Sequence, residues 1–169
     1  MRRYYATDSI VGDAVTTPMG AQSERLNAIQ GAGLPPFCLT LAPFMPIMFL
    51  KNFDPAQGLN NGTTLLVTDL ADHFITAIII TQGVHYGRIV NIGRAEVVAD
   101  ARSIRRTYSL MRYQFPITPC LALTINKSQG ITRRVVGAYL DSPVFSWGQL
   151  YTIFTRVGMP RPLSMTDRE

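Results

Sequence analysis

The sequence predicts an α/β chain in which a small β module is followed by an α/β unit. Short β-type runs recur at roughly ten to twelve residues between Met45 and Ile92, a spacing typical of small antiparallel barrels or sandwiches. From Ile117 onward the pattern predicts helix, strand and helix in about forty residues, which favours a mostly parallel sheet. Of the 169 residues 47% are apolar, so the chain can bury a core.

The β module is predicted from runs rich in β-branched and apolar residues. An early strand-like piece at Arg3–Tyr5 is followed by a polar, turn-rich stretch. Turn signals at Asp54-Pro55, Asn60–Gly62 and Gly83–Gly87 then separate the later runs. These runs are Met45–Leu50, Thr63–Leu70, Phe74–Thr81 and Arg88–Ile92. We interpret residues 34 to about 95 as one compact module; such barrels often bind nucleic acid, but a fold does not establish a function.

The α/β unit is predicted from caps and apolar periodicity. Thr118 with Pro119 indicates a helix start, and Gly130 would end that helix after about Gln129. The β-branched stretch Arg134–Leu140 predicts a buried strand. Ser146 would cap a second helix, whose apolar face would be formed by Leu150, Ile153, Phe154 and Val157.

Composition excludes several classes of protein. Two distant cysteines, Cys38 and Cys120, exclude a disulfide scaffold and paired-cysteine zinc sites, and His73 and His85 lack partners at metal-ligand spacing. The uncharged stretch from residue 26 to 50 contains four prolines, which argues against a membrane span. The first ten residues resemble no signal peptide, so we expect an intracellular protein without a membrane partner.

Positive charge is concentrated in one part of the chain. The formal net charge is +5, and no acidic residue lies between Asp100 and Asp141. This interval is consistent with either a solvated face or a surface for nucleic acid. Its basic residues are Arg102, Arg105, Arg106, Arg112, Lys127, Arg133 and Arg134.

The segment TINKSQG, residues 124–130, is the most informative one for chemistry. Hydroxyls, an amide, an ammonium and a glycine are the groups that hold phosphate oxygens. On a helix Thr124 and Lys127 would share one face, with Ser128 beside them. Taken alone, the segment could also be an ordinary polar helix end.

Further segments in the same order make the pattern specific. They are LPP at 34–36, FLKNFDPAQGLNNGTTLLVT at 49–68, RYQFPI at 112–117 and PVFSWGQLYTIFTRV at 143–157. With TINKSQG, they closely resemble the C-terminal part of the PIF-type superfamily-one-B helicases, which are ATP-dependent 5′→3′ DNA helicases. The match is nearest to the Helitron-related branch and covers most of residues 25–158. Phe44, where the family usually has a turn glycine, and Thr118, where it has a basic residue, depart from the pattern.

The resemblance implies three parts and a set of site residues. Residues 1–24 would be a remnant of the helicase core, 25–116 the inserted SH3-like 2B barrel, and 117–169 the end of the second RecA-like domain of a P-loop NTPase. By position, single-stranded DNA would be bound by Thr124, Asn126, Lys127 and Ser128, and the nucleotide by Gln129, Gly130 and Arg156. Arg156 would be the catalytic arginine finger, where a guanidinium stabilises charge on a transferred phosphoryl group. The same arginine could instead interact with its own helix dipole.

The sequence also lacks parts of a complete helicase. Its two lysines, Lys51 and Lys127, follow Leu50 and Asn126, so there is no Walker A loop, and no Asp-Glu pair stands for Walker B. ATP with Mg would therefore require the missing first RecA-like domain, in cis or as another chain, and we expect no ATP hydrolysis by this chain alone. The family implies a nuclear location. A stand-alone nucleic-acid-binding module and a non-functional remnant of a mobile-element helicase remain as alternatives.

Overall fold

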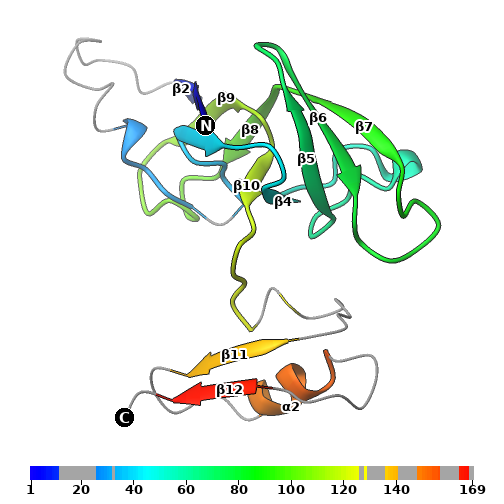
Figure 1. Cartoon of the computed structure of the whole chain (residues 1–169). Helices are drawn as coiled ribbons and strands as arrows, with labels where there is room; N and C mark the ends of the chain where they lie inside the picture. The colour runs from blue at the N-terminus through cyan, green and yellow to red at the C-terminus, as the bar shows by residue number, and fades with distance from the viewer. Residues whose placement is uncertain are drawn as a thin grey trace. The chain divides into compact units, whose positions relative to one another are not determined.

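The computed structural model describes residues 1–11, 26–31, 33–125, 128, 136–140, 148–156 and 164–167. The chain divides into two compact units, Met1–Leu121 and Ala122–Glu169 (Figure 1). Several sequence features fall wholly or partly outside the described residues, among them most of the TINKSQG segment, the start of the predicted strand 134–140, the predicted Ser146 cap and part of the segment 143–157.

The first unit is built from antiparallel strands. Its largest sheet has the order β10-β4-β5-β6-β7, and the two others pair β1 with β3 and set β9 between β2 and β8. A short 3-10 turn, Pro55–Gln57, lies between β4 and β5. The strands are β1 Arg2–Tyr5, β2 Thr7–Val11, β3 Cys38–Leu41, β4 Pro46–Phe49, β5 Thr64–Leu70, β6 Phe74–Ile79, β7 Ile89–Gly93, β8 Ala95–Ala99, β9 Ser109–Gln114 and β10 Ile117–Pro119.

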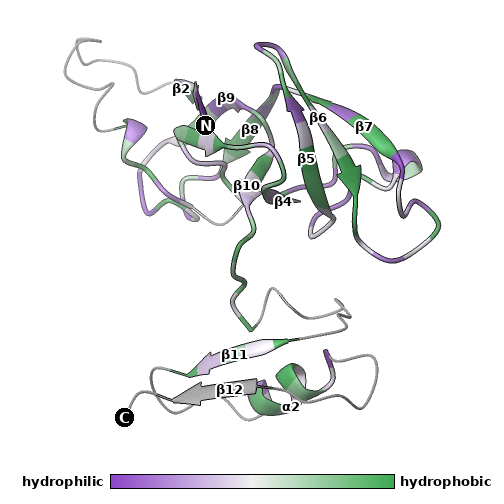
Figure 2. Cartoon of the chain, in the orientation of Figure 1, coloured by the Kyte–Doolittle hydropathy of each residue, from purple (hydrophilic) through white to green (hydrophobic). Residues whose placement is uncertain are grey.

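The five-stranded sheet shares one core with the β1–β3 pair. Inward positions alternate along β6, where Ile75, Ala77 and Ile79 are buried, as expected when one face of a strand is covered. Tyr4 of β1 and Leu39 of β3 belong to the same cluster. Figure 2 shows the apolar stretches of β5 and β6. The four strands predicted at 45–50, 63–70, 74–81 and 88–92 are confirmed as β4 to β7.

The three-stranded sheet β2-β9-β8 covers a second, smaller core. Val97 and Leu110 from this sheet pack with Leu26, Ile29 and other residues of the preceding loop segment. Most apolar side chains of this cluster are buried below a tenth of their surface. Within the first eleven residues, β1 pairs with β3 and β2 pairs with β9, so this segment is part of the first unit.

The helix predicted from Thr118 is wrong at its start. Ile117–Pro119 form β10, which pairs antiparallel with β4 in the register Ile117 to Phe49. Ile117 is fully buried in the core of the large sheet, and the tertiary pairing overrides the local cap signal of Thr118 and Pro119. The unit boundary accordingly falls at Leu121, whereas the sequence placed it between 116 and 117.

The second unit contains a parallel strand pair with a helix between the strands. β11, Gly137–Leu140, pairs with β12, Ser164–Asp167, and α2 spans Gln149–Phe154. Parallel pairing across a helical connection is the α/β arrangement that the sequence predicted. Ala138 is buried as the predicted buried strand requires, whereas Tyr139 of the same strand is 63% exposed, so the prediction is wrong at that position.

The α2 helix differs in detail from its prediction. It follows Gly148, whose φ of 90° is in the left-handed region, and no side chain caps it. Of its predicted apolar face, Ile153 is buried while Phe154 is 52% exposed; Val157 lies outside the described residues. Within the described ranges, no helix has the length and apolar character needed to cross a membrane.

Candidate functional site

The described residues of the TINKSQG segment, Thr124, Ile125 and Ser128, are joined by hydrogen bonds. The backbone N–H of Ser128 donates to the carbonyls of Thr124 and Ile125, both at 3.1 Å. The Ser128 hydroxyl also donates to the Ile125 carbonyl at 2.6 Å, while Thr124 is exposed. These bonds hold Ser128 close to the backbone of Thr124 and Ile125. Asn126, Lys127, Gln129 and Gly130 lie outside the described residues.

Arg156 lies at the C-terminal end of α2 and contacts its own helix. Its Nε donates to the carbonyl of Thr152 at 3.0 Å, and its Nη2 donates to the hydroxyl of Thr155 at 2.9 Å. The guanidinium thus neutralises the carbonyl end of the helix, as expected for a cation at a helix C-terminus. Nη1 makes no hydrogen bond to any described residue, and the side chain is half-buried.

The structure gives no direct link between the two predicted motifs. In the part of the chain that it describes, no hydrogen bond or ion pair joins Thr124 or Ser128 to Arg156. Their roles in binding DNA and nucleotide remain predictions from the sequence.

Arg112 is the most highly connected polar side chain of the first unit. It is 1% exposed and forms a buried ion pair with Asp8, in which Nε and Nη2 each donate to one carboxylate oxygen at 2.7 Å. Nη1 donates to the carbonyls of Ile29 and Pro35 at 3.3 and 2.9 Å. Nη2 donates further to the Leu26 carbonyl at 3.2 Å. Each of the five N–H groups of the guanidinium therefore has a partner.

Gln114, two residues later on β9, makes a second set of buried contacts. Its Nε2 donates to the carbonyls of Tyr4 and Phe37 at 3.0 and 3.2 Å. Its Oε1 accepts from the Phe115 N–H at 3.0 Å and from Arg94 at 3.3 Å. Burial also raises the pKa of the Tyr4 phenol above its usual value, and its hydroxyl donates to a backbone carbonyl at 2.8 Å.

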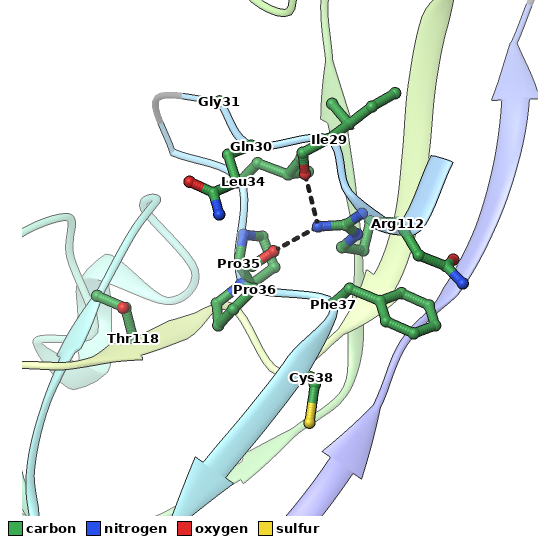
Figure 3. Close-up of a pocket in the computed structure, with 11 residues that line it drawn as sticks. Ile29, Gln30, Gly31, Leu34, Pro35, Pro36, Phe37, Cys38, Arg112 and Thr118 are labelled. Carbon is green, nitrogen blue, oxygen red and sulfur yellow. Dashed lines mark hydrogen bonds between the residues drawn. The ribbon is translucent and has the colours of Figure 1, made fainter. Parts of the chain in front are cut away.

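A surface pocket of about 470 Å³ lies beside this network (Figure 3). The loop from Ile29 to Cys38 forms most of its wall, and Figure 3 shows the Arg112 guanidinium bonded to the Ile29 and Pro35 carbonyls. Because each N–H group of Arg112 already has a partner in the protein, the guanidinium is not available to a ligand. Arg112 therefore does not belong to the nucleic-acid surface that its charge suggested in the sequence.

The other basic residues of the predicted surface have different environments. Arg102, Arg105 and Arg106 are exposed in the turn between β8 and β9. Lys127, Arg133 and Arg134 lie outside the described residues. The buried hydrogen-bonding roles of Arg112 and Gln114 were not predicted from the sequence. The motif RYQFPI, which contains both residues, could have indicated that they matter. No cluster of His, Cys, Asp or Glu suited to a metal ion occurs among the described residues.

Comparison with known proteins supports the resemblance seen in the sequence. Residues 24–70 match the family model described as DNA helicase Pif1, 2B domain. No curated protein matches the chain. A solved structure that describes DNA unwinding at forked dsDNA by two coordinating Pif1 helicases is 26% identical, with a TM-score of 0.64, and the match covers 97% of this chain and 33% of that chain.

Two further Pif1 structures show the same relationship. Pif1 helicase from Bacteroides, in complex with ADP-AlF3 and ssDNA, is 24% identical over 98% of this chain and 34% of its own, with a TM-score of 0.64. Pif1 helicase from Candida albicans is 22% identical over 97% of this chain and 39% of its own, with a TM-score of 0.66. The resemblance to PIF-type helicases is thus confirmed, together with a fold that combines RecA-like α/β structure and a small β domain. The chain spans about a third of the length of the helicases it matches.

Proposed function

We propose that this chain acts as the C-terminal part of an ATP-dependent 5′→3′ DNA helicase, which binds single-stranded DNA and completes an ATP site. The observation that carries the proposal is the match of 97% of the chain to a Pif1 helicase structure. The Bacteroides relative is described as a complex with ADP-AlF3 and ssDNA, which supports both a DNA partner and a nucleotide.

Single-stranded DNA is bound, in this proposal, by Thr124, Asn126, Lys127 and Ser128. Thr124 is exposed, so its hydroxyl can contact a phosphate oxygen. The Ser128 hydroxyl proton is donated to the Ile125 carbonyl, so this hydroxyl must rotate away from that carbonyl to donate to a phosphate oxygen. We therefore assign most of the electrostatic attraction to the Lys127 ammonium, the one charged group of the four.

The nucleotide contacts are assigned to Gln129, Gly130 and Arg156. Arg156 fits this role in part, because its Nη1 is not bonded to any described residue and two threonine oxygens position the rest of the guanidinium. Walker A and Walker B residues and the Mg ligands must come from a first RecA-like domain. When ATP is bound there, it supplies the phosphoryl transfer that drives unwinding, and Arg156 would donate to the charged oxygens from this side. We expect the chain by itself to hydrolyse no ATP.

A nuclear location and a role in the DNA transactions of a genome or a Helitron-type element complete the proposal. Both are supported by the motif resemblance, whose nearest branch is Helitron-related, and imaging of the tagged chain in cells would test the location.

The proposal is tested by the salt dependence of binding to labelled oligo-dT, followed by fluorescence anisotropy. If roughly three to five phosphates are neutralised, the slope of log K against log salt is about −2 to −4. A slope near zero, or no binding by the folded chain, would contradict a single-strand contact of this kind.

A second candidate function is a stand-alone nucleic-acid-binding module. The observation that favours it is that the first unit has its own extensive core and forms a self-contained set of antiparallel strands. In this case substitutions on the β module, and not in the 124–130 segment, would weaken DNA binding.

A further inference from the structure

The turn between β8 and β9 carries a concentrated positive charge. Arg102, Arg105 and Arg106 are all exposed within an eight-residue segment, residues 101–108. The loop between β8 and β9 is strongly hydrophilic in Figure 2. This segment lies outside residues 24–70, which match the 2B family model.

The turn has a defined shape. Backbone N–H groups of Ser103 and Ile104 donate to the Asp100 carbonyl at 2.9 and 3.3 Å, and that of Arg106 donates to the Ala101 carbonyl at 2.9 Å. Ile104 is 8% exposed and packs into the smaller core. Because the apolar side chain points inward, the neighbouring arginines extend into solvent from an anchored backbone.

These guanidiniums have no acidic partner in the described part of the chain. The ion pairs there join Arg2 to Asp72 and Arg112 to Asp8. Asp100 precedes the turn and is exposed, but it makes no ion pair with the arginines that follow it. Within the described ranges, three arginines at short spacing are therefore without an ion-pair partner and can contact an anionic one.

We propose that the turn Ala101–Tyr108 binds the phosphate backbone of duplex DNA. This inference rests on the proposed helicase function and adds a duplex contact to the single-strand contact of the 124–130 segment. Guanidinium groups bind phosphate oxygens with charge-assisted hydrogen bonds and without base readout.

The composition of the turn selects duplex DNA over other anionic partners. Its one aromatic residue, Tyr108, is partly buried against the smaller core, which limits the ring surface on which an unpaired base could stack. Its one large aliphatic residue, Ile104, is buried, so nothing apolar is available to insert into a membrane surface. In duplex DNA the bases are already paired, so the arginines can bind the phosphate backbone without contacting a base.

The test compares two double variants of the full chain that lose the same charge. Arg102→Ser with Arg106→Ser removes two arginines of the turn, and Arg3→Ser with Arg88→Ser removes two exposed arginines elsewhere in the same unit. Binding is measured by anisotropy against a blunt duplex, a duplex with an oligo-dT arm, and oligo-dT alone, over a salt series. Thermal melts by circular dichroism confirm that each variant is folded.

We expect the turn variant to weaken binding to both duplex substrates several-fold. The slope of log K against log salt should become shallower by about 2, because two phosphate contacts are lost. Binding to oligo-dT should stay unchanged, and the control variant should retain most of its duplex binding.

Three results would overturn the inference: an equal loss in the control variant, an equal loss on oligo-dT, or no loss on duplex DNA. If the wild-type chain binds oligo-dT and no duplex, the inference fails while the proposed function stands. If it binds duplex through the turn and no oligo-dT, the proposed single-strand function fails while the inference stands.

Discussion

At the scale of single residues, Arg112 shows how a charged side chain can be structural. It joins the carboxylate of Asp8 to three backbone carbonyls of the loop segment between residues 26 and 35. The groups that it binds are separated from it by 77 to 104 residues in sequence. A buried guanidinium is tolerated because all of its donors are satisfied.

Replacing Arg112 with Met should destabilise the first unit by about 3–5 kcal/mol, because it leaves the Asp8 carboxylate buried without its counter-ion. Urea unfolding followed by far-ultraviolet circular dichroism measures this free energy. Arg102→Ser, at an exposed site, serves as the control and should change it by less than about 0.5 kcal/mol. A loss below about 1 kcal/mol for Arg112→Met would contradict the role assigned to this network.

Phe44 is a residue in an unfavourable conformation. Its φ is 62°, in the left-handed region, and its side chain is 75% exposed, so little packing offsets the strain. Phe44→Gly should raise the free energy of unfolding by about 0.5–1 kcal/mol, after allowance for the greater freedom of glycine in the unfolded chain.

The control for this prediction is Phe74→Gly. Phe74 is also partly exposed but lies in β6, where glycine weakens a strand. The two substitutions should therefore shift the melting temperature in opposite directions. A decrease for Phe44→Gly would show that its exposed ring contributes more than the strain costs.

At the scale of elements, the strands β4 to β7 could be predicted because β6 and β7 alternate buried and more exposed residues, while β4 and β5 are short, mostly apolar runs between turn signals. β9 could not, because two of its inward positions are the buried polar residues Arg112 and Gln114, which interrupt the apolar pattern. β10 has three residues and takes its conformation from pairing with β4, which no local signal reveals. The charge pattern of the sequence indicates the exposed arginines of the β8–β9 turn. Only the structure shows that these arginines are exposed while Arg112 is buried.

Another feature at this scale is the packing of the 3-10 turn Pro55–Gln57 against the loop between β6 and β7. Gly58, which ends the turn, has a φ of 79°, and an added Cβ would lie 2.6 Å from the His85 ring. Gly62 has a φ of 88° and no atom within 4 Å of such a Cβ. The two glycines share the same backbone requirement but differ in their neighbours.

Gly58→Ala should therefore destabilise the first unit more than Gly62→Ala. Both variants incur backbone strain of about 1 kcal/mol, and Gly58→Ala adds the displacement of His85. Chemical denaturation of the two variants gives the difference. Equal losses would mean that His85 moves away freely and that the loop is not held by this contact.

At the scale of the whole molecule, the positive charge of the chain and its resemblance to Pif1 helicases both support the proposal of DNA as its partner. The chain has a formal net charge of +5, and among the residues that the structure describes the exposed turn arginines are unpaired. Its relatives are helicases, one of which is described in complex with ssDNA. Residues 124–130 are proposed to be the segment through which the chain binds single-stranded DNA.

The most direct test of that claim uses the two lysines of the chain as a matched pair. Lys127 lies in the 124–130 segment, whereas Lys51 lies in the β module and donates to the Val98 carbonyl at 2.8 Å. Binding of each Lys→Ala variant to labelled oligo-dT is measured by anisotropy over a salt series. Lys127→Ala should weaken binding and make the slope shallower by about 0.7, while Lys51→Ala should bind like the wild type. Unchanged binding by Lys127→Ala with a loss in Lys51→Ala would contradict the claim and favour a DNA-binding β module.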